Sequence, residues 1–339
     1  MDDIYVYDFD ETIYDGDVTA DFYKYCLKHN RKVLKHIFFQ IWAFFKYLFG
    51  FTKWTQFKGD MLGYFKYLDD IDSVVDNFWQ ENKHKIKDWY LKKDHSKDVI
   101  ISASPECLLK KICYNYLKVN LLIGTLADEK TGKITKQNCY GNQKVKRLNE
   151  ILKNYKIKEF YSDSLSDAPL ADLAEQSYIV LGDNLINWQK YTLPWFNKLK
   201  LLFLSRDFIL FVMLGVINTF NSVVFSLIFN KVIVNTSIAF CWGYILSNVV
   251  AYLLNTTIIF KEKLSLVKYI KFFISYIPNF LIQLAIVFII CDILGGCNLL
   301  AYIVAAVIGV PVTFLCLKLF AFKPVSANKN INPYLFKEL

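Results

Sequence analysis

Charge is scarce in this chain of 339 residues and unevenly distributed. Only 21% of the residues are charged, while 54% are apolar and 17% aromatic. Lys, Asp and Glu crowd the first two hundred residues, and from Phe208 onward long stretches carry no charge. An ordinary soluble enzyme has a lower apolar content and more charge. We therefore expect a soluble domain followed by a membrane domain.

Several motifs are missing as well. The eight Cys are scattered, with no C-x-x-C and no Cys/His cluster at zinc spacing, which favours free thiols in a reducing compartment. No nucleic-acid-binding motif accompanies the net charge of +9. The lysines are interleaved with aromatic residues, so we expect an anionic membrane as the partner and no nucleic acid. The first residues are acidic and do not form a signal peptide, so we expect the first domain to stay in the cytoplasm.

Four apolar segments fill the second half, near residues 208–229, 237–260, 270–291 and 299–321. Each is close to the ~20 residues that a helix needs to span a bilayer, which predicts four transmembrane helices. Basic residues gather before the first segment, between the second and third, and after the fourth. The positive-inside rule therefore predicts that both termini lie in the cytoplasm.

The four segments also look like two copies of a helix pair. Phe260 ends the second segment and Phe322 ends the fourth, each followed by Lys. Asn218 and Asn279 lie at matching depth in the first and third, so the offset is about 61 or 62 residues. Duplicated helix pairs occur in transporter folds, so this pattern predicts an internal repeat.

The pattern before residue 184 is different, because short apolar runs alternate with helical segments. The runs lie near residues 4–7, 99–101, 121–123, 160–161 and 178–180. Alternating strands and helices predict an α/β fold with a parallel sheet and right-handed crossovers. The expected divisions are an α/β domain at 1–183 with a helical cap at about 13–95, an amphipathic linker at 184–205, an all-α four-helix transmembrane domain at 206–325 and a cytoplasmic tail at 326–339.

One helix of the cap, at residues 33–51, is unusually rich in Phe, Ile and Trp, with Lys35 and Lys46 among them. Two interpretations stay open. It is either a core helix of a helical subdomain, or a helix that lies in the membrane interface, cationic on one side and aromatic on the other.

Acidic residues directly follow the first predicted strand. Asp8 and Asp10 face one site if the chain turns there, so that one can attack a phosphorus while the other exchanges a proton with the leaving group. A carboxylate that attacks an anionic phosphate needs a cation, and a hard cation such as magnesium takes oxygen ligands. Asp163 and Asp167 follow a later strand and can supply them, because ligands gather at the strand ends of open parallel sheets.

A phosphate also needs hydrogen-bond donors. Ser102 follows the strand at 99–101 and offers a hydroxyl. Lys144 stands at the start of a predicted helix and offers a charge near the positive helix end. Each of these residues alone is an ordinary surface residue, and their order along the chain makes them a candidate site.

This order of motifs resembles that of the haloacid dehalogenase superfamily of phosphatases over residues 1–183. The stretch D-F-D-E-T at 8–12 is similar to the D-x-D-x-T motif, and the stretches at 100–104, 141–144 and 162–167 are similar to the second, third and fourth motifs. The resemblance implies a Rossmann-like sheet with a helical cap. It also implies roles for the residues: Asp8 is the nucleophile that forms an aspartyl-phosphate, Asp10 the general acid and then the base, Ser102 and Lys144 bind the phosphoryl group, and Mg²⁺ is held by Asp8, the Asp10 carbonyl and Asp163 with Asp167 supporting.

Two positions depart from the family pattern without removing a functional group. Glu11 and Ser162 stand where Gly is frequent. The cap resembles the phosphoserine-phosphatase-like branch, and residues 131–134 and 138–141 resemble a group within it that acts on lipid-linked phosphates. Residues 206–323 resemble the GtrA-like family, whose members are associated with cell-surface polysaccharide synthesis and the movement of polyprenyl-phosphate-linked sugars.

These features predict a membrane-bound, magnesium-dependent phosphomonoester hydrolase. Its substrate would be an anionic lipid such as a polyprenyl-phosphate sugar phosphate or a phosphatidylglycerol phosphate, handled at the cytoplasmic face of the membrane. An alternative makes the membrane half primary, as a flippase of polyprenyl-phosphate-linked sugars with the phosphatase as accessory. A third interpretation is a phosphatase of soluble metabolites that is only tethered.

Overall fold

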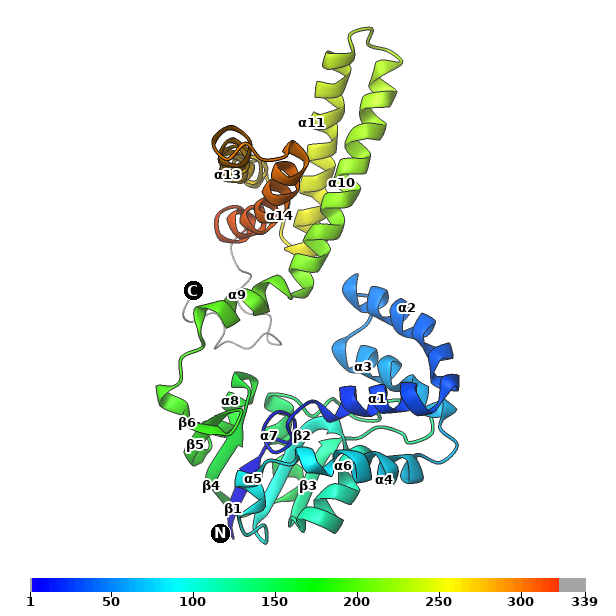
Figure 1. Ribbon diagram of the computed structural model, residues 1–339, viewed down its shortest axis with the longest axis vertical. Helices are drawn as coiled ribbons and strands as arrows, with labels where there is room; N and C mark the ends of the chain where they lie inside the picture. Colours follow the sequence, from blue (N-terminus) through cyan, green and yellow to red (C-terminus); the bar gives the residue numbers. More distant parts are fainter. Residues whose placement is uncertain (1, 323–339) are drawn as a thin grey trace. The chain divides into compact units, whose positions relative to one another are not determined.

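The computed structural model describes residues 2–322, and its described residues divide into two compact units between Thr192 and Leu193 (Figure 1). Within the second unit, side chains are described at all positions but 236, 237, 240, 292, 298, 299, 302, 303 and 306. The expected tail at 326–339 lies outside the described residues. All eight cysteines are free, as expected.

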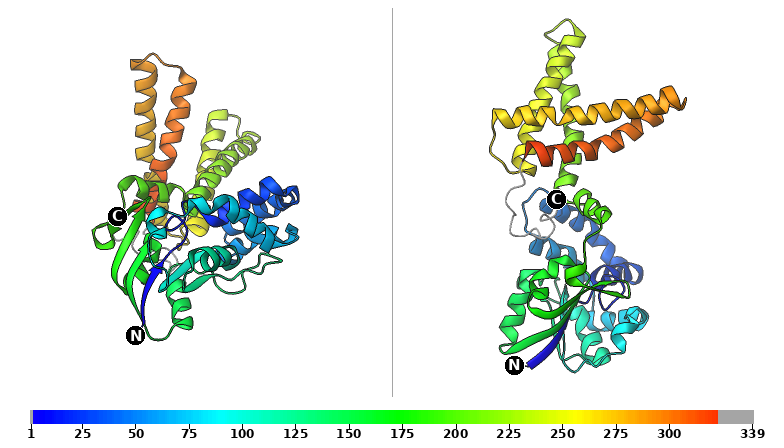
Figure 2. Two further views of the ribbon diagram at one scale, coloured as in Figure 1. Left: turned by 60° about the horizontal axis from the view of Figure 1, so that its bottom comes forward. Right: turned by 90° about the vertical axis from the view of Figure 1, so that its left-hand side faces the viewer.

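A six-stranded sheet in the order β3-β2-β1-β4-β5-β6 forms the first unit (Figure 2). Neighbouring strands are parallel except for β5 and β6, which confirms the α/β prediction. The strands are β1 (Asp2–Tyr7), β2 (Asp98–Pro105), β3 (Leu121–Thr125), β4 (Tyr155–Ser162), β5 (Ala174–Leu181) and β6 (Asn184–Asn187). Because β1 lies between β2 and β4, the residues after it stand in the middle of one sheet edge.

The sequence placed the residues of strand β6 in the linker, whereas the structure shows that they form a strand of the sheet. It pairs antiparallel with β5 through a two-residue turn, with Leu181 opposite Asn184. Gly182 has a φ of +61° there, which a tight hairpin turn requires and glycine adopts without strain. The sheet therefore extends one strand beyond the predicted domain boundary.

Helices cover the two faces of the sheet and give it two buried cores. One core packs Val6, Ile101 and Phe160 against α7 (Asn142–Ile151) and α8 (Ala168–Ala171). The other packs Tyr7 and Ile100 against the cap. The remaining elements of this part are α6 (Glu106–Lys111), η4 (Ile112–Leu117) and η5 (Leu165–Asp167). Both faces of the central strands are apolar, as buried parallel strands require.

The cap follows β1 and is helical. Its elements are α1 (Val18–His29), η1 (Arg31–His36), α2 (Ile37–Leu48), α3 (Trp54–Leu62), η2 (Gly63–Tyr67), α4 (Ile71–Asn82), η3 (Lys83–Lys85) and α5 (Asp88–Leu91). Asp17 caps α1 by accepting a hydrogen bond from the backbone of Ala20. Phe22 on α1 packs edge-on against Phe65 and Phe78, so the aromatic residues hold the cap helices together.

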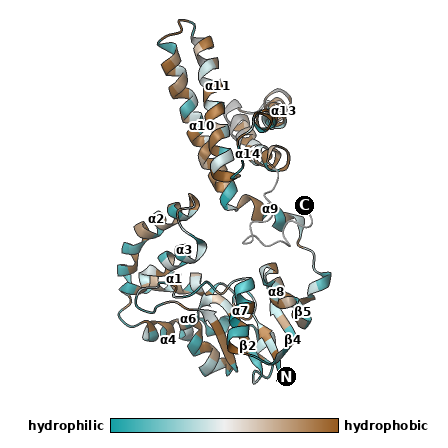
Figure 3. Ribbon diagram, turned by 180° about the vertical axis from the view of Figure 1, so that it is seen from behind, coloured by the Kyte–Doolittle hydropathy of each residue, from teal (hydrophilic) through white to brown (hydrophobic). Residues whose placement is uncertain are grey.

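The second unit is helical and strongly apolar, as Figure 3 shows by the brown colour along α10 and α11. Its elements are α9 (Trp195–Phe203), α10 (Arg206–Asn230), α11 (Thr236–Leu254), η7 (Asn255–Ile259), α12 (Leu266–Ile274), α13 (Tyr276–Val287), η8 (Phe288–Ile293), α14 (Asn298–Cys316) and η9 (Leu317–Ala321). The preceding η6 (Trp188–Lys190) is the last helix of the first unit. Three helical stretches are long and apolar enough to cross a membrane, namely Arg206–Asn230, Cys241–Ile259 and Leu266–Cys291. Of the fourth predicted span, the described residues form a shorter apolar helix at Val307–Ala321. The chain is thus a membrane protein.

Aromatic contacts within this unit follow the internal repeat. Phe211 packs against Phe314 with ring centroids 5.5 Å apart, and Tyr252 packs against Phe272 with centroids 5.6 Å apart. Positions 211 and 272 correspond under the predicted offset, and so do 252 and 314. The same two equivalent positions in each helix pair therefore contact the other pair. This is what a two-fold arrangement of two similar halves requires.

Two further contacts concern the positions that defined the repeat. Phe260 and Phe322 stack on one another with centroids 4.1 Å apart and planes at 12°, so equivalent residues meet directly. Asn218 accepts a hydrogen bond of 2.5 Å from Ser247 on α11. Asn279 Oδ1 is buried without a partner among the described residues, so the two halves differ in their polar contacts.

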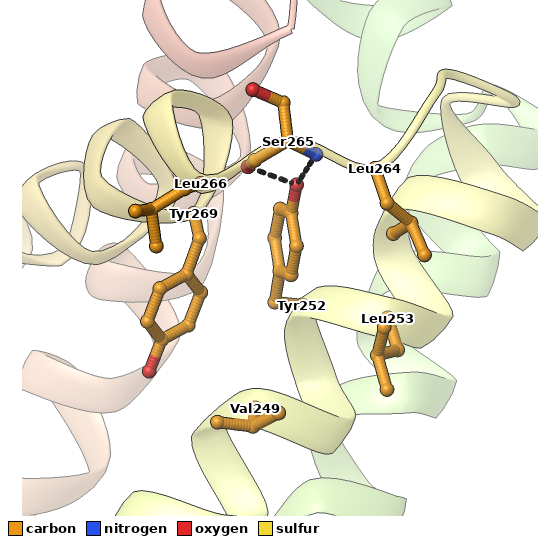
Figure 4. Close-up of a pocket in the computed structure, with 7 residues that line it drawn as sticks. All are labelled: Val249, Tyr252, Leu253, Leu264, Ser265, Leu266 and Tyr269. Carbon is orange, nitrogen blue, oxygen red and sulfur yellow. Dashed lines mark hydrogen bonds between the residues drawn. The ribbon is translucent and has the colours of Figure 1, made fainter.

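A hollow of about 380 Å³ lies where α11 approaches the start of α12 (Figure 4). Its lining residues are mostly apolar and none is charged: Val249, Tyr252, Leu253, Leu264, Ser265, Leu266 and Tyr269. The Tyr252 hydroxyl donates to the carbonyl of Ser265 at 2.8 Å and accepts from its N–H at 3.0 Å. These two bonds tie the loop after α11 to the helix, and the hollow beside them is lined mostly by apolar side chains.

Candidate active site

Asp8 is the first residue after the central strand β1. Its N–H donates to the carbonyl of Tyr161 on β4 at 2.9 Å, which fixes the backbone at the sheet edge. Its Oδ1 accepts from the Phe9 N–H at 2.9 Å and lies 2.9 Å from Lys144 Nζ. Burial raises the pKa of Asp8 well above its usual value. Lys144 opposes this rise, and the neighbouring carboxylates of Asp167, Asp163 and Asp10 add to it.

Lys144 contacts one carboxylate of the first motif and one of the fourth. It lies in the first turn of α7, is only 2% exposed, and its Nζ donates to Asp167 Oδ2 at 2.6 Å as well as contacting Asp8. Ser162 Oγ donates to the same Asp167 oxygen at 2.8 Å. Burial disfavours the ammonium, but Asp167 and Asp8 outweigh it and raise the pKa of Lys144. Lys144 is therefore a fixed positive charge between two carboxylates.

Asp10 is held by hydrogen bonds from two elements. Its Oδ1 accepts from the Val18 N–H at the start of α1 at 2.8 Å. Its Oδ2 accepts from Ser102 Oγ at 3.1 Å and Ser104 Oγ at 2.6 Å, both on β2. Burial and then Asp17 raise the pKa of Asp10, and these hydrogen bonds offset part of the rise. A raised pKa suits a carboxyl group that must carry a proton near neutral pH.

Asp163 begins the loop after β4 and faces the same edge. Its N–H donates to Thr12 Oγ1 at 2.9 Å, which joins the two acidic loops. Burial raises the pKa of Asp163 to about 6; Lys144 lowers it and Asp167 raises it. Asp167 is 1% exposed, and its Oδ1 is buried with no hydrogen-bond partner among the described residues. The structure thus brings all six predicted site residues to one sheet edge.

This cluster fits a hard cation. Two carboxylates, Asp8 and Asp167, contact one buried ammonium, Asp163 and Asp10 lie near enough to Asp8 to raise its pKa, and one buried carboxylate oxygen of Asp167 lacks a partner among the described residues. No group of three His, Cys, Asp or Glu side chains placed to hold a metal is present among the residues that the structure describes. The ligand set implied by the resemblance needs only two side chains, Asp8 and Asp163, with the carbonyl of Asp10, so it agrees with that result. Oxygen-only ligands favour Mg²⁺ over a transition metal.

Some residues of the site were not predicted. Ser104 stands two positions after Ser102 on the same strand face, so the spacing was a usable signal. Lys58 comes from α3 of the cap, and its Nζ donates to the carbonyl of Ala103 at 2.6 Å and to Asn138 Oδ1 at 3.0 Å. Burial lowers the pKa of Lys58, although Asp10 and Asp17 oppose this. Nothing in the sequence singles out Lys58 among its many neighbouring lysines.

The acidic turn contains a strained residue. Glu11 has a φ of +54°, in the left-handed region that favours glycine, which explains why Gly is frequent at this position of the family motif. Its backbone is held there because Glu11 N–H donates to Gly16 O at 3.0 Å and Lys87 Nζ donates to Glu11 O at 2.5 Å. The strain costs roughly 1–2 kcal/mol.

Glu11→Gly is therefore expected to stabilise the first unit. After the higher chain entropy of glycine in the unfolded state is subtracted, the gain is roughly 0.5–1 kcal/mol. Thermal unfolding should show an apparent midpoint about 2 °C higher. Glu11→Ala is the matched control, because it also removes the side chain but keeps the strain. Equal midpoints for the two variants would show that the turn is not strained.

The fold and the cluster together define a class of protein. An open parallel sheet carries buried carboxylates and a lysine at the carboxyl ends of its central strands, beneath a helical insertion that follows the first strand. This is the arrangement of an α/β enzyme that acts on a charged group at the sheet edge.

Two family models agree with this class. The family of haloacid dehalogenase-like hydrolases matches residues 5–172, and the GtrA/DPMS transmembrane domain matches residues 210–322. The chain therefore joins a haloacid dehalogenase-like hydrolase domain to a GtrA/DPMS transmembrane domain, as the two resemblances predicted. Among solved structures, the crystal structure of a protein of unknown function from Bordetella pertussis Tohama I is similar, with a TM-score of 0.44 and 17% identity over 53% of this chain and 90% of that chain. No curated protein matches.

Proposed function

We propose that the hydrolase domain cleaves a phosphate monoester by way of an aspartyl-phosphate on Asp8. The observation that carries this proposal is the bridge of Lys144 between Asp8 and Asp167, beside an Asp10 that accepts hydrogen bonds from two serines. A nucleophile, an acid and a fixed cation then stand within one buried cluster. This is the set that transfer of a phosphoryl group to a carboxylate needs.

The steps follow from the positions of the side chains. A carboxylate oxygen of Asp8 attacks the phosphorus while Asp10 gives its proton to the leaving oxygen, so an acyl-phosphate bond forms as the ester bond breaks. Asp10 then takes a proton from a water molecule that attacks the same phosphorus, which frees Asp8 and inorganic phosphate. Ser102 and Lys144 bind the phosphoryl oxygens throughout.

We assign the cation site to Asp8, the carbonyl of Asp10 and Asp163, with Asp167 as a supporting residue. Bound Mg²⁺ would offset the repulsion between the carboxylates and the phosphate. Asp163 suits this role because its partly buried carboxylate lies near enough to Lys144 and Asp167 for both to shift its pKa. Asp167 in turn orients Lys144 through the bond of 2.6 Å.

We further propose that the substrate is a lipid-linked phosphate, such as a polyprenyl-phosphate sugar phosphate or a phosphatidylglycerol phosphate. The GtrA/DPMS transmembrane domain in the same chain supports a polyprenyl context. The basic residues at 198–206, 261–268 and 323–329 support a cytoplasmic position for the hydrolase domain and both termini.

A phosphate-release screen tests this proposal. The full-length chain in detergent should release phosphate from polyprenyl and phosphatidylglycerol phosphates at least ~10-fold faster, in kcat/KM, than from phosphoserine, because the tail adds binding energy. Chelation of magnesium should abolish release, and added Mg²⁺ should restore it. Equal rates on phosphoserine would favour a tethered phosphatase of soluble metabolites, and release that is insensitive to chelation would contradict the cation site.

A second candidate function is the movement of polyprenyl-phosphate-linked sugars across the membrane by residues 210–322. The family match and the internal repeat of two helix pairs favour it, because repeated halves are common in transporters. In this case, hydrolysis would only commit the substrate. A chain that transports but cannot hydrolyse would separate the two functions.

A further inference from the structure

Helix α2 of the cap buries a polar side chain and exposes large apolar ones, which is the opposite of a helix on the surface of a water-soluble protein. It buries Gln40, Ala43 and Leu48, while Phe38 and Trp42 are 80% and 64% exposed. Gln40 is fixed on the inner side, because it accepts from Tyr23 Oη at 2.6 Å and donates to Met61 O at 2.9 Å. The outward set of large apolar residues, called the α2 face below, consists of Phe38, Phe39, Ile41, Trp42 and Phe45. A contiguous face of this kind marks a contact surface.

A basic pocket of about 310 Å³ opens beside the α2 face, between α2, α3 and the loop at 131–133. Lys46, Lys66 and Lys133 line it, together with one carboxylate, Asp60. Asp60 lies 3.6 Å from Lys46, so the lining keeps a net positive charge. Lys66 lies over the ring of Phe39 at 5.0 Å, which joins the charged pocket to the α2 face.

His36 contributes a buried atom without a partner. The side chain lines the pocket and is 5% exposed. Its Nε2 donates to the carbonyl of Asp60 at 2.9 Å, because a carbonyl can only accept. Its Nδ1 is buried and has no hydrogen-bond partner among the described residues. A neutral ring can accept there from a ligand hydroxyl, and a protonated ring can donate to a phosphate oxygen.

Two glycines allow the walls of this pocket to pack closely against one another. A Cβ on Gly63 would lie 2.7 Å from His36 Nε2, so only glycine leaves room for the ring. A Cβ on Gly132 would collide with the carbonyl of Leu62, and Gly132 has a φ of +71°. The loop at 131–133 is therefore pressed against α3, and the pocket is built by the cap and the hydrolase core together.

We propose that the α2 face lies in the cytoplasmic interface of the bilayer and that the basic pocket binds the phosphate headgroup of an anionic membrane lipid. Exposed Trp and Phe favour the interfacial layer, and lysines beside them attract anionic headgroups. The chain keeps the first unit tethered near the bilayer, because only 13 residues lie between Thr192 and the first span at Arg206, which is under ~50 Å even if fully extended.

This docking site has a consequence for the acidic cluster. Helix α3 lines the pocket with Gly59 and Asp60, and the preceding Lys58 contacts Ala103 and Asn138 beside the cluster. A lipid held in the pocket therefore contacts the helix that also reaches the candidate active site. The proposal does not depend on which phosphate the acidic cluster hydrolyses, and its test measures contact with lipid and not turnover.

Photo-crosslinking in the full-length chain tests the docking. The variant Phe38→p-benzoylphenylalanine is reconstituted in nanodiscs of phosphatidylcholine and phosphatidylglycerol, and the sample is illuminated. Tyr116→p-benzoylphenylalanine is the matched control, since Tyr116 is an aromatic residue of η4 that is 48% exposed but lies outside the α2 face. We expect lipid adducts at position 38 on the order of ten times more often than at position 116, because interfacial residence brings acyl chains into contact. Equal yields would overturn the proposal, as would crosslinks from position 38 to a second copy of the chain.

The headgroup pocket is tested in the same Phe38 chain. Lys46→Gln with Lys133→Gln should lower the adduct yield in nanodiscs with phosphatidylglycerol to near that of the position-116 control, since each basic residue is worth up to about fivefold, or about 1 kcal/mol, and should leave the yield unchanged in phosphatidylcholine alone. Lys110→Gln with Lys153→Gln, two exposed lysines outside the pocket, is the control. An equal loss in both double variants would overturn the pocket. Inorganic phosphate added to phosphatidylcholine nanodiscs should not raise the yield; a rise equal to that with phosphatidylglycerol would show that the pocket takes free phosphate.

Discussion

Asp8→Asn is expected to lower the rate of phosphate release at least ~10³-fold, which corresponds to about 4 kcal/mol in the activation barrier. The substitution keeps the shape of the side chain and replaces the nucleophilic carboxylate with a neutral amide. Lys144 and Asp10 remain in place, so any residual rate measures what binding alone contributes. The measurement is phosphate release by the full-length chain with Mg²⁺ present.

The same variant should stay folded, and charge explains why. Burial raises the pKa of Asp8 in the folded state, so ionisation of Asp8 lowers the free energy of unfolding. This loss of stability grows as the pH rises above the ordinary pKa of an aspartate. At neutral pH without metal, Asn at this position removes that cost. The apparent unfolding midpoint in chelator should equal or exceed that of the unsubstituted chain. A large fall in the midpoint would mean that lost activity reports a lost fold.

Asp15→Asn provides the matched control for hydrolysis. Asp15 lies in the same loop but is exposed, and its backbone N–H, which donates to Lys85 O, is unaffected by the change. Its rate should stay within about twofold of the unsubstituted chain, as for most surface substitutions. Full activity in Asp8→Asn, or equal losses in both variants, would contradict the assignment of Asp8 as nucleophile.

Asp8→Asn also separates the two candidate functions. In proteoliposomes, translocation of a labelled polyprenyl-phosphate sugar should continue in this variant if residues 210–322 are a transporter, because Asp8 lies in the other unit. Translocation that stops together with hydrolysis would indicate that the membrane domain only serves the enzyme. No translocation in either chain would leave hydrolysis as the function and remove the second candidate.

The sheet was largely predictable because buried parallel strands are continuous apolar runs. The run at 99–101 lies in the first half of β2, and the run at 4–7 is most of β1. The predicted strand at 160–161 is only the end of β4 (Tyr155–Ser162), since its first half alternates apolar residues with lysine and hides the strand. Strand β6 was missed although Gly182-Asp183 is a hairpin signal, because the basic, tryptophan-containing residues that follow drew the segment into the linker.

The site was predictable to the extent that it depends on strand ends. Asp8 and Asp163 each follow a parallel strand and Ser102 lies in β2, so the sheet order alone brings them together. Lys58 reaches the cluster only through the packing of the cap, which no local pattern specifies. The orientation of α2 was likewise undetermined, because large apolar side chains occupy nearly every face of that helix. Burial of Gln40 decides it in favour of an exposed aromatic face.

Lys144→Met should both abolish hydrolysis and destabilise the first unit. Lys144 is the only described ammonium that contacts Asp8 and Asp167, at 2.9 and 2.6 Å, and it is 2% exposed. Removing it leaves two buried carboxylates uncompensated, which costs about 3–5 kcal/mol. Because its pKa is raised, the charge is present throughout the neutral range, and the stability it contributes is lost only at strongly alkaline pH. The apparent unfolding midpoint should fall by on the order of 10 °C in chelator.

Two further variants make this prediction specific. Lys146→Met changes an exposed lysine on the same helix and should shift the midpoint by less than about 2 °C. Adding Asp167→Asn to Lys144→Met removes one of the uncompensated charges, so the double variant should recover part of the lost stability while hydrolysis stays absent. If Lys144→Met and Lys146→Met unfold at the same temperature, the ion pairs of Lys144 contribute nothing to the fold. If the double variant is less stable than Lys144→Met, the instability comes from lost packing and not from the unpaired carboxylates.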